Sequence, residues 1–291
     1  MTATTTFTYS HTVGFLANQG RGFNNPVDVA LDSQGILYVL NRAGPETALR
    51  MPYKRVVMCT VDEDYLGELG TGGTGDGEFW WPSALAFDSD DRLYVADEAL
   101  QRVSIFTKSG ELLGQWGEQG PRDGQLDRPS AMVFDSEDNI YLTDSLNHRV
   151  QKFGKDGAFL GNWGEEGDGP GQFNMPWGIA LDGNGDVYVS DWRNDRVQKF
   201  DPSGRYLAQW GSSGDGEGQF KRPSGLAVDP DGNIYVCDWG NERVQVLSPS
   251  GQVLACFRGD SVTSTWATAY FEANPDEGAA RLVADLEPEV N

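Results

Sequence analysis

Apolar residues recur along most of the chain in short runs, and turn-forming residues bound each run. In the clearest copy, "GLAV" at 225–228 is apolar throughout and predicts a strand buried on both faces. "DPDGN" then predicts a tight turn, and "IYVCD" at 234–238 predicts a second strand. A short polar loop leads to a third strand, "RVQVL" at 243–247, and "YLAQWG" at 206–211 is the fourth strand of the preceding copy. The pattern therefore predicts a unit of four short antiparallel strands.

The unit occurs five times, in phase on one proline. Successive prolines are 56, 47, 47 and 47 residues apart, and they are Pro26, Pro82, Pro129, Pro176 and Pro223. A fixed period of this size indicates an array of one supersecondary unit. Four antiparallel strands in about 40–45 residues are typical of a propeller blade, so we predict an all-β propeller.

The repeated motifs resemble the NHL repeat. They read P-x-G-[LIV]-A-[VL]-D, then [IV]-Y-V-x-D, then N-x-R-[VI]-Q-x-[FL], with "GxxGxGxF" between units. The resemblance covers residues 23–260, with repeats that start near 23, 79, 126, 173 and 220. It implies a propeller of the six-bladed type. It leaves function open, because the family includes enzymes, ligand-binding modules and ubiquitin-ligase targeting domains.

The two ends of the chain bear on how the ring closes. Residues 1–22 align with the fourth strand and the loop after it, so we expect the outer strand of a closing sixth blade there. Residues 261–291 contain no strand motifs and predict an acidic segment with two short helices, the first capped by Ser264 and the second starting at Asn274. We therefore expect five blades plus a partial, truncated sixth, and a natural five-bladed ring is the alternative. Unpaired strand edges at an unclosed blade invite self-association or pairing with another chain.

Composition narrows the choice of partners. The 44 acidic and 22 basic residues give a net charge of −22, which disfavours nucleic acid and anionic membranes as partners. The three cysteines have no metal-binding spacing, and we expect reduced thiols. No secretory signal and no run long enough to span a bilayer is found, so we expect a cytoplasmic protein.

Residues that recur in every unit are expected to build the fold. Each unit ends its second strand in Asp, or Asn in the first unit, and an Arg follows five residues later in units two to five; we expect these charges to pair and to join strands two and three. The pairs are Asp97 with Arg102, Asp144 with Arg149, Asp191 with Arg196, and Asp238 with Arg243. Trp116, Trp163 and Trp210 end the fourth strand and are expected to fill the space between blades.

Function is expected where the units differ. The resemblance implies that the strand-four-to-one loops and the strand-two-to-three loops share one face around the central channel. The candidate ligand-binding residues on this loop face are Trp81, Arg128, Met175, Trp177, Trp192, Arg193, Arg222, Trp239 and His148. Indole and guanidinium groups are typical anchors of binding surfaces, although the same rings could instead pack against neighbouring loops. An insertion between Asn41 and Arg55 should lie over this face, as a lid or as a tolerated surface loop.

The motifs favour recognition over catalysis. The chain has two histidines, His11 and His148, which excludes the histidine-rich zinc site that the resemblance implies for amidating lyases. We therefore predict a non-catalytic scaffold without a cofactor that binds a protein, a peptide or a small ligand. The alternative is a Ca²⁺-dependent hydrolase similar to propeller lactonases, with a metal in the channel. Its candidate oxygen ligands are Asn41, Asp97, Glu98 and Asp144.

Overall fold

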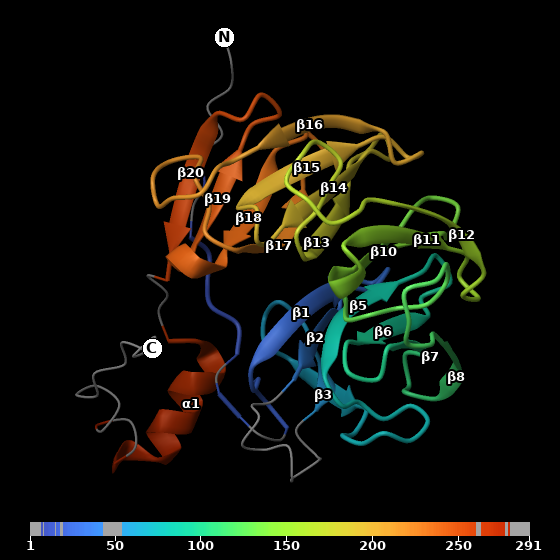
Figure 1. Cartoon of the computed structure of the whole chain (residues 1–291). Coiled ribbons are helices and arrows are strands. Elements are labelled where there is room, and N and C mark those ends of the chain that lie inside the picture. The colour runs from blue at the N-terminus through green and yellow to red at the C-terminus, as the bar shows by residue number, and fades with distance from the viewer. Residues whose placement is uncertain are drawn as a thin grey trace.

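The computed structural model describes residues 7, 9–14, 16, 17, 20–42, 54–259, 263–276 and 279. Within them lie five four-stranded antiparallel sheets and one α-helix (Figure 1). In each sheet the strands are hydrogen-bonded in sequence order, so each sheet is one propeller blade. The first strands of consecutive blades contact one another, β1 with β5, β5 with β9, β9 with β13, and β13 with β17. The predicted all-β propeller is confirmed for the described part of the chain.

The strands coincide with the repeated motifs. Blades 1 and 2 consist of β1 (Pro26–Leu31), β2 (Leu37–Asn41), β3 (Arg55–Cys59), β4 (Tyr65–Leu69), β5 (Pro82–Phe87), β6 (Leu93–Asp97), β7 (Arg102–Phe106) and β8 (Leu112–Trp116). Blades 3 and 4 consist of β9 (Pro129–Phe134), β10 (Ile140–Asp144), β11 (Arg149–Phe153), β12 (Phe159–Trp163), β13 (Pro176–Leu181), β14 (Val187–Asp191), β15 (Arg196–Phe200) and β16 (Tyr206–Trp210). Blade 5 consists of β17 (Pro223–Val228), β18 (Ile234–Asp238), β19 (Arg243–Leu247) and β20 (Val253–Arg258), and the helix is α1 (Thr265–Ala273).

The core lies between the blades. Tyr188 and Val197 of blade 4 are buried in one cluster with Ile234 and Val236 of blade 5, and the other neighbouring blades pack in the same way. Trp210 stacks on Tyr188 with ring centroids 5.8 Å apart and lies at the edge of this cluster. Trp116 and Trp163 pack equivalently, so the predicted role of these indoles between blades is confirmed.

The predicted Asp–Arg pairs form in blades 3, 4 and 5. The Nε atom of each arginine lies 2.7–2.9 Å from a buried carboxylate oxygen, and the pairs are Arg149–Asp144, Arg196–Asp191 and Arg243–Asp238. The prediction is wrong for blade 2. There the Asp97 carboxylate accepts four backbone N–H groups, those of Trp80, Trp81, Ala99 and Leu100. Arg102 instead donates to the carbonyl of Glu78, because backbone donors have already saturated the carboxylate.

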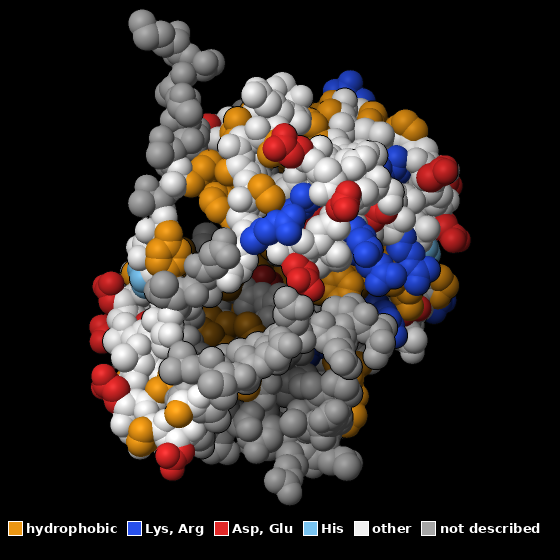
Figure 2. Space-filling view, turned by 90° about the vertical axis from the view of Figure 1, so that its left-hand side faces the viewer, with side chains coloured by type: hydrophobic (Ala, Val, Ile, Leu, Met, Phe, Trp, Pro, Cys, Tyr) orange, Lys and Arg blue, Asp and Glu red, His pale blue; other side chains and the backbone are white. Residues whose placement is uncertain are grey.

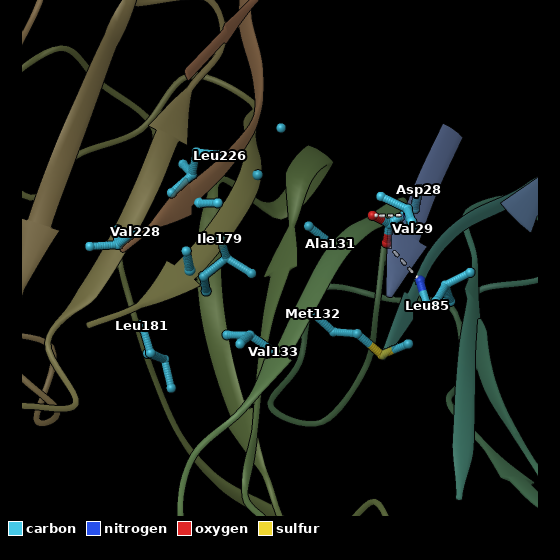
Figure 3. A pocket seen from close by; sticks show the side chains of 14 residues that line it. Asp28, Val29, Leu85, Ala131, Met132, Val133, Ile179, Leu181, Leu226 and Val228 are labelled. Carbon is cyan, nitrogen blue, oxygen red and sulfur yellow. Dashed lines mark hydrogen bonds between the residues drawn. The ribbon is translucent and has the colours of Figure 1, made fainter. Parts of the chain in front are cut away.

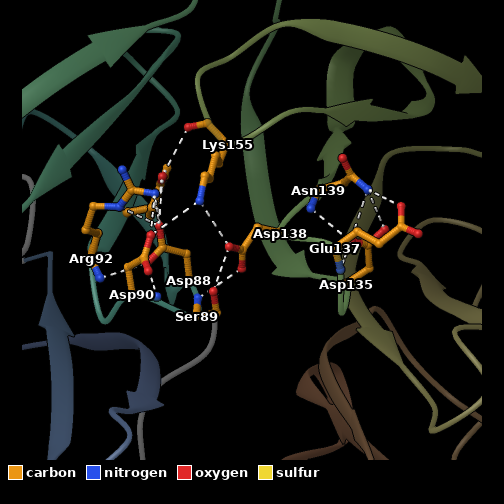
Figure 4. A network of polar contacts seen from close by, with 10 residues as sticks. Asp88, Ser89, Asp90, Arg92, Asp135, Glu137, Asp138, Asn139 and Lys155 are labelled. Atoms are coloured by element: carbon orange, nitrogen blue, oxygen red, sulfur yellow. Dashed lines mark hydrogen bonds and ion pairs between the residues drawn. The ribbon is translucent and has the colours of Figure 1, made fainter.

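The turns between the first and second strands tie neighbouring blades together (Figure 4). Ser89 of blade 2 donates to the Asp138 carboxylate of blade 3 at 2.7 Å. Lys155 of blade 3 forms ion pairs with both Asp138 and Asp90, at 3.2 and 3.3 Å. These acidic turns therefore bond to one another and to lysine, as ordinary polar turns do.

The predicted six-bladed type is wrong for this chain, because its described residues form five blades. Residues 9–14 form no strand with a described partner, since the three inner strands that such a strand would need are not among residues 263–276. Ser264 caps α1 as predicted, and its hydroxyl accepts the Ala267 N–H. The second predicted helix, from Asn274, runs into residues outside the described part. Among the described helices, none is long and apolar enough to cross a membrane.

Candidate functional site

The two sets of loops named in the sequence analysis lie at the same end of each blade. Backbone hydrogen bonds join them within every blade from the second to the fifth. The bonds run from Glu98 N to Trp81 O at 3.0 Å, from Ser145 N to Arg128 O at 3.2 Å, from Arg193 N to Asn174 O at 3.0 Å, and from Gly240 N to Lys221 O at 2.8 Å. The acceptor stands one residue before the repeated proline in blades 2 and 3 and two residues before it in blades 4 and 5, so the loop before each proline lies beside the end of the second strand. The loops form one face of the propeller, as expected.

Five of the predicted residues form one contact cluster on this face, which we call the tryptophan–arginine patch: Trp177, Trp192, Arg193, Arg222 and Trp239. The rings of Trp177 and Trp192 have centroids 6.0 Å apart. The Arg222 guanidinium lies 5.1 Å from the Trp192 ring and 6.0 Å from the Trp239 ring, so it bridges blades 4 and 5. Trp239 is 58% exposed and both arginines are exposed. The patch thus presents aromatic and cationic groups to solvent.

A second group of similar chemistry surrounds Trp81 in blade 2. The Arg42 guanidinium lies 4.2 Å from the Trp81 ring and forms an ion pair with Glu98. Lys54 is buried, with its amine 4.9 Å from the Trp80 ring and 5.1 Å from the Trp81 ring, and burial lowers its pKa. Arg42 and Lys54 flank the predicted insertion, of which residues 43–53 lie outside the described part. Arg42 thus pairs with a carboxylate and Lys54 donates to the Trp80 carbonyl, whereas the arginines of the tryptophan–arginine patch form no ion pair with a described residue.

The predicted residues that directly precede the repeated proline have a structural reason for their positions. Arg128, Met175 and Arg222 precede the repeated proline with φ of 57°, 57° and 55°. Their N–H groups donate to the preceding blade in the sequence. The acceptors are Gln101 Oε1 at 2.7 Å, His148 Nδ1 at 3.2 Å and Asp195 Oδ1 at 2.7 Å, respectively. His148 is therefore an acceptor that links blades 3 and 4, and Met175 is buried. The sequence could have indicated these links between blades, because each acceptor stands 27 residues before its donor.

Sequence reasoning missed Asp28, which lies in the central channel (Figure 3). The first strands of the blades enclose a cavity of about 310 Å³, and Asp28 is the one charged side chain among the described residues that line it. Its carboxylate accepts the N–H of Leu85 at 2.8 Å and that of Val29 at 2.9 Å. Burial in this apolar channel raises the pKa of Asp28 to about 6. The sequence could have indicated Asp28, because the other units have Ala or Gly at this position of the repeat.

The four candidate metal ligands are each held within the propeller by other bonds. Asn41 Oδ1 accepts the Asn24 N–H at 2.7 Å, and Glu98 pairs with Arg42. Asp97 binds four backbone N–H groups, and Asp144 binds Arg149 and the Asp127 N–H. Within the described ranges, no three His, Cys, Asp or Glu side chains are grouped as a metal site would require.

Comparison with protein families matches the NHL repeat at residues 126–153, 173–200 and 220–247. Comparison with curated proteins gives no match. Among solved structures, a catalytically inactive virginiamycin B lyase from Staphylococcus aureus with quinupristin is 14% identical, with a TM-score of 0.57 over 81% of this chain and 71% of that chain. A protein of unknown function from Bacteroides caccae is 17% identical, with a TM-score of 0.59 over 80% and 81%. A chain of the nidogen/laminin complex is 14% identical, with a TM-score of 0.58 over 80% of each. At these identities the likeness is one of fold.

Proposed function

The described part of this chain is a five-bladed β-propeller, and three of its blades match the NHL repeat. We propose that the chain is a non-catalytic recognition scaffold whose tryptophan–arginine patch binds an acidic segment of a protein partner. The observation that carries the proposal is the set of contacts that the two arginines of the patch make. Neither Arg193 nor Arg222 forms an ion pair with a described residue, although the chain has a net charge of −22. Both are held over indole rings instead, which leaves their N–H groups available to a carboxylate partner.

The geometry of the patch suits a peptide or a protein more than a small molecule. The three indoles and two guanidinium groups come from two neighbouring blades and lie on an open loop face. Tryptophan and arginine at the centre of a contact surface carry much of the binding energy in protein complexes. Carboxylates on the partner would match the local positive charge, while the rest of this acidic protein would repel other acidic surfaces and so restrict the binding mode.

The proposal is tested by selecting displayed random peptides on the wild-type chain and measuring their affinities for variants by calorimetry. We expect acidic sequences to be selected, and we expect Trp239→Ala and Arg222→Ala to weaken their binding at least tenfold, which is about 1.4 kcal/mol. The matched control is Arg205→Ala, because Arg205 is also an exposed arginine, lies on an outer hairpin of blade 4 and pairs with Asp201. Peptides that bind the wild type and both patch variants with equal affinity would exclude the patch as the binding surface.

A second measurement addresses catalysis directly. The purified chain is incubated with a panel of lactones and esters, with Ca²⁺ and with a chelator. Turnover that depends on Ca²⁺ and is lost in Asp144→Asn would contradict the non-catalytic assignment and support the hydrolase alternative.

A further inference from the structure

Blade 5 presents to solvent a sheet face that the other blades bury. In blades 2, 3 and 4, the residue before the second-strand aspartate is fully buried against the next blade; these residues are Ala96, Thr143 and Ser190. Their equivalent in blade 5, Cys237, is exposed. Tyr235 and Val244 on the same face are only partly covered, whereas their equivalents in blades 2 to 4 are buried. Among the described residues, this face therefore has no neighbouring blade of the kind that covers the same face in blades 2 to 4.

Blade 1 presents the complementary face. Val29 is 54% exposed, whereas its equivalents Leu85, Met132 and Ile179 are buried against the preceding blade. Leu31 on the same strand is 57% exposed. Both faces line one cavity of about 440 Å³, which we call the seam, and Val29, Val39, Ala227, Tyr235, Cys237 and Val244 form much of its wall. Figure 2 faces this side of the molecule and shows hydrophobic side chains inside a hollow.

We propose that the seam accepts three antiparallel strands of a blade-like segment supplied by another polypeptide. The repeat itself indicates the occupant. The exposed side chains of the seam are those that neighbouring blades bury, so the shape that fits both walls is another blade. Such a segment must be apolar on both faces, because the described residues of the seam wall include one charged side chain, Asp28.

The N-terminal segment indicates why three strands suffice. Leu16 forms a bridge with Phe23, as Gly72 does with Phe79 after the fourth strand of blade 1. Phe7 packs edge-on against Phe257 and Tyr235 of blade 5, with ring centroids 5.2 and 6.2 Å apart. The described residues of the segment thus contact blade 5 at Phe7 and lead into blade 1 from Leu16, and the fourth strand of a closing blade would join the same two blades. The described residues supply no inner strands to the seam, and three such strands are what a closing blade would add.

The cysteines of blade 5 provide a footprint for the test. Cys237 pairs with Val244 and Cys256 pairs with Gln245, so the two thiols lie on opposite faces of the same sheet. Both are exposed, and Cys237 alone lines the seam, while Cys59 is buried. A thiol reagent therefore reports occupancy of the seam at Cys237, with Cys256 as an internal control in the same blade.

The probe is a synthetic peptide of residues 173–200, which contains the three inner strands of blade 4 and no cysteine. We expect a saturating amount of this peptide to slow maleimide labelling of Cys237 in the full chain at least tenfold and to leave Cys256 unchanged. The matched control peptide carries Val189→Asp, which places a charge on the face that must pack, and it should give no protection. Equal labelling of Cys237 with and without the probe would overturn the proposal.

Two other results would also overturn the proposal, because each would show that the chain itself or a second copy of it, and not a different polypeptide, fills the seam. If Cys237 of the chain alone resists labelling at every concentration, the chain fills the seam with its own residues. If Cys237 becomes protected only as the concentration of the chain rises, in step with dimer formation by sedimentation, the occupant is a second copy.

Discussion

At the residue scale, Asp28 shows how one departure from a repeat changes the physics of a site. The equivalent positions in the other blades are Ala84, Ala131, Gly178 and Gly225. The carboxylate bonds the first strand of blade 1 to the N–H of Leu85 in blade 2, and this bond holds a charge in an apolar channel. Two backbone donors offset only part of the cost of burying that charge, so the pKa is raised to about 6 from 3.8.

The raised pKa predicts a pH-dependent loss of stability. The Asp28 carboxyl keeps its proton up to a higher pH in the folded chain than in the unfolded chain. The contribution that this proton makes to stability is complete below about pH 4 and is lost as the pH rises through 6. We expect the free energy of unfolding of Asp28→Ala, minus that of the wild type, to increase by about 1–3 kcal/mol between pH 4 and pH 7. Urea unfolding of both chains across this range measures the difference. Parallel stability curves would show that the carboxyl is not buried in the native state.

At the element scale, the first strands show which blade faces are filled. A Cβ atom added to Gly178 in β13 would meet the Ser224 carbonyl oxygen at 2.3 Å, because β17 packs directly against it. The same addition at Gly225 in β17 would meet nothing closer than the Cys237 sulfur at 3.7 Å. The two glycines occupy the same repeat position, and the difference arises because no described strand follows blade 5.

This pair gives a matched prediction. We expect Gly178→Ala to lower the free energy of unfolding by about 1–3 kcal/mol, because backbone atoms must shift to relieve the overlap. Gly225→Ala should be neutral or stabilising by up to about 1 kcal/mol, since alanine restricts the unfolded chain and meets open space in the fold. Chemical denaturation of the two variants measures both effects. Equal destabilisation by both substitutions would contradict the open seam.

The elements also show how far the sequence predicts this structure. The strands, the turns and three Asp–Arg pairs follow from the repeat, because each depends on contacts within 47 residues of chain. The exception at Asp97 does not follow, since it depends on how the loop around Trp80 presents its backbone donors. The loop face was predictable, but the bridging position of Arg222 between Trp192 and Trp239 required the angle between two blades.

At the scale of the whole molecule, the N-terminal segment and α1 meet at one buried carboxylate, that of Glu63. Glu63 lies in the turn between β3 and β4 of blade 1. Its side chain accepts the N–H of Gly14 from the N-terminal segment and, at 2.8 Å, that of Trp266 from α1. The Trp266 indole also donates to the Glu63 carbonyl. In Figure 1, α1 accordingly lies beside blade 1, where it and the N-terminal segment both bond to Glu63.

This arrangement predicts that Glu63 stabilises both ends together. We expect Glu63→Ala to lower the free energy of unfolding by about 2–4 kcal/mol, because it leaves two buried N–H groups without an acceptor. Amide exchange should accelerate in residues 263–276 and in residues 9–14 together, since one carboxylate holds both. The control is Asp62→Ala, an exposed neighbour that should change stability by no more than about 0.5 kcal/mol. If exchange accelerates in only one of the two segments, the ends are held independently, and the turn of blade 1 does not couple them.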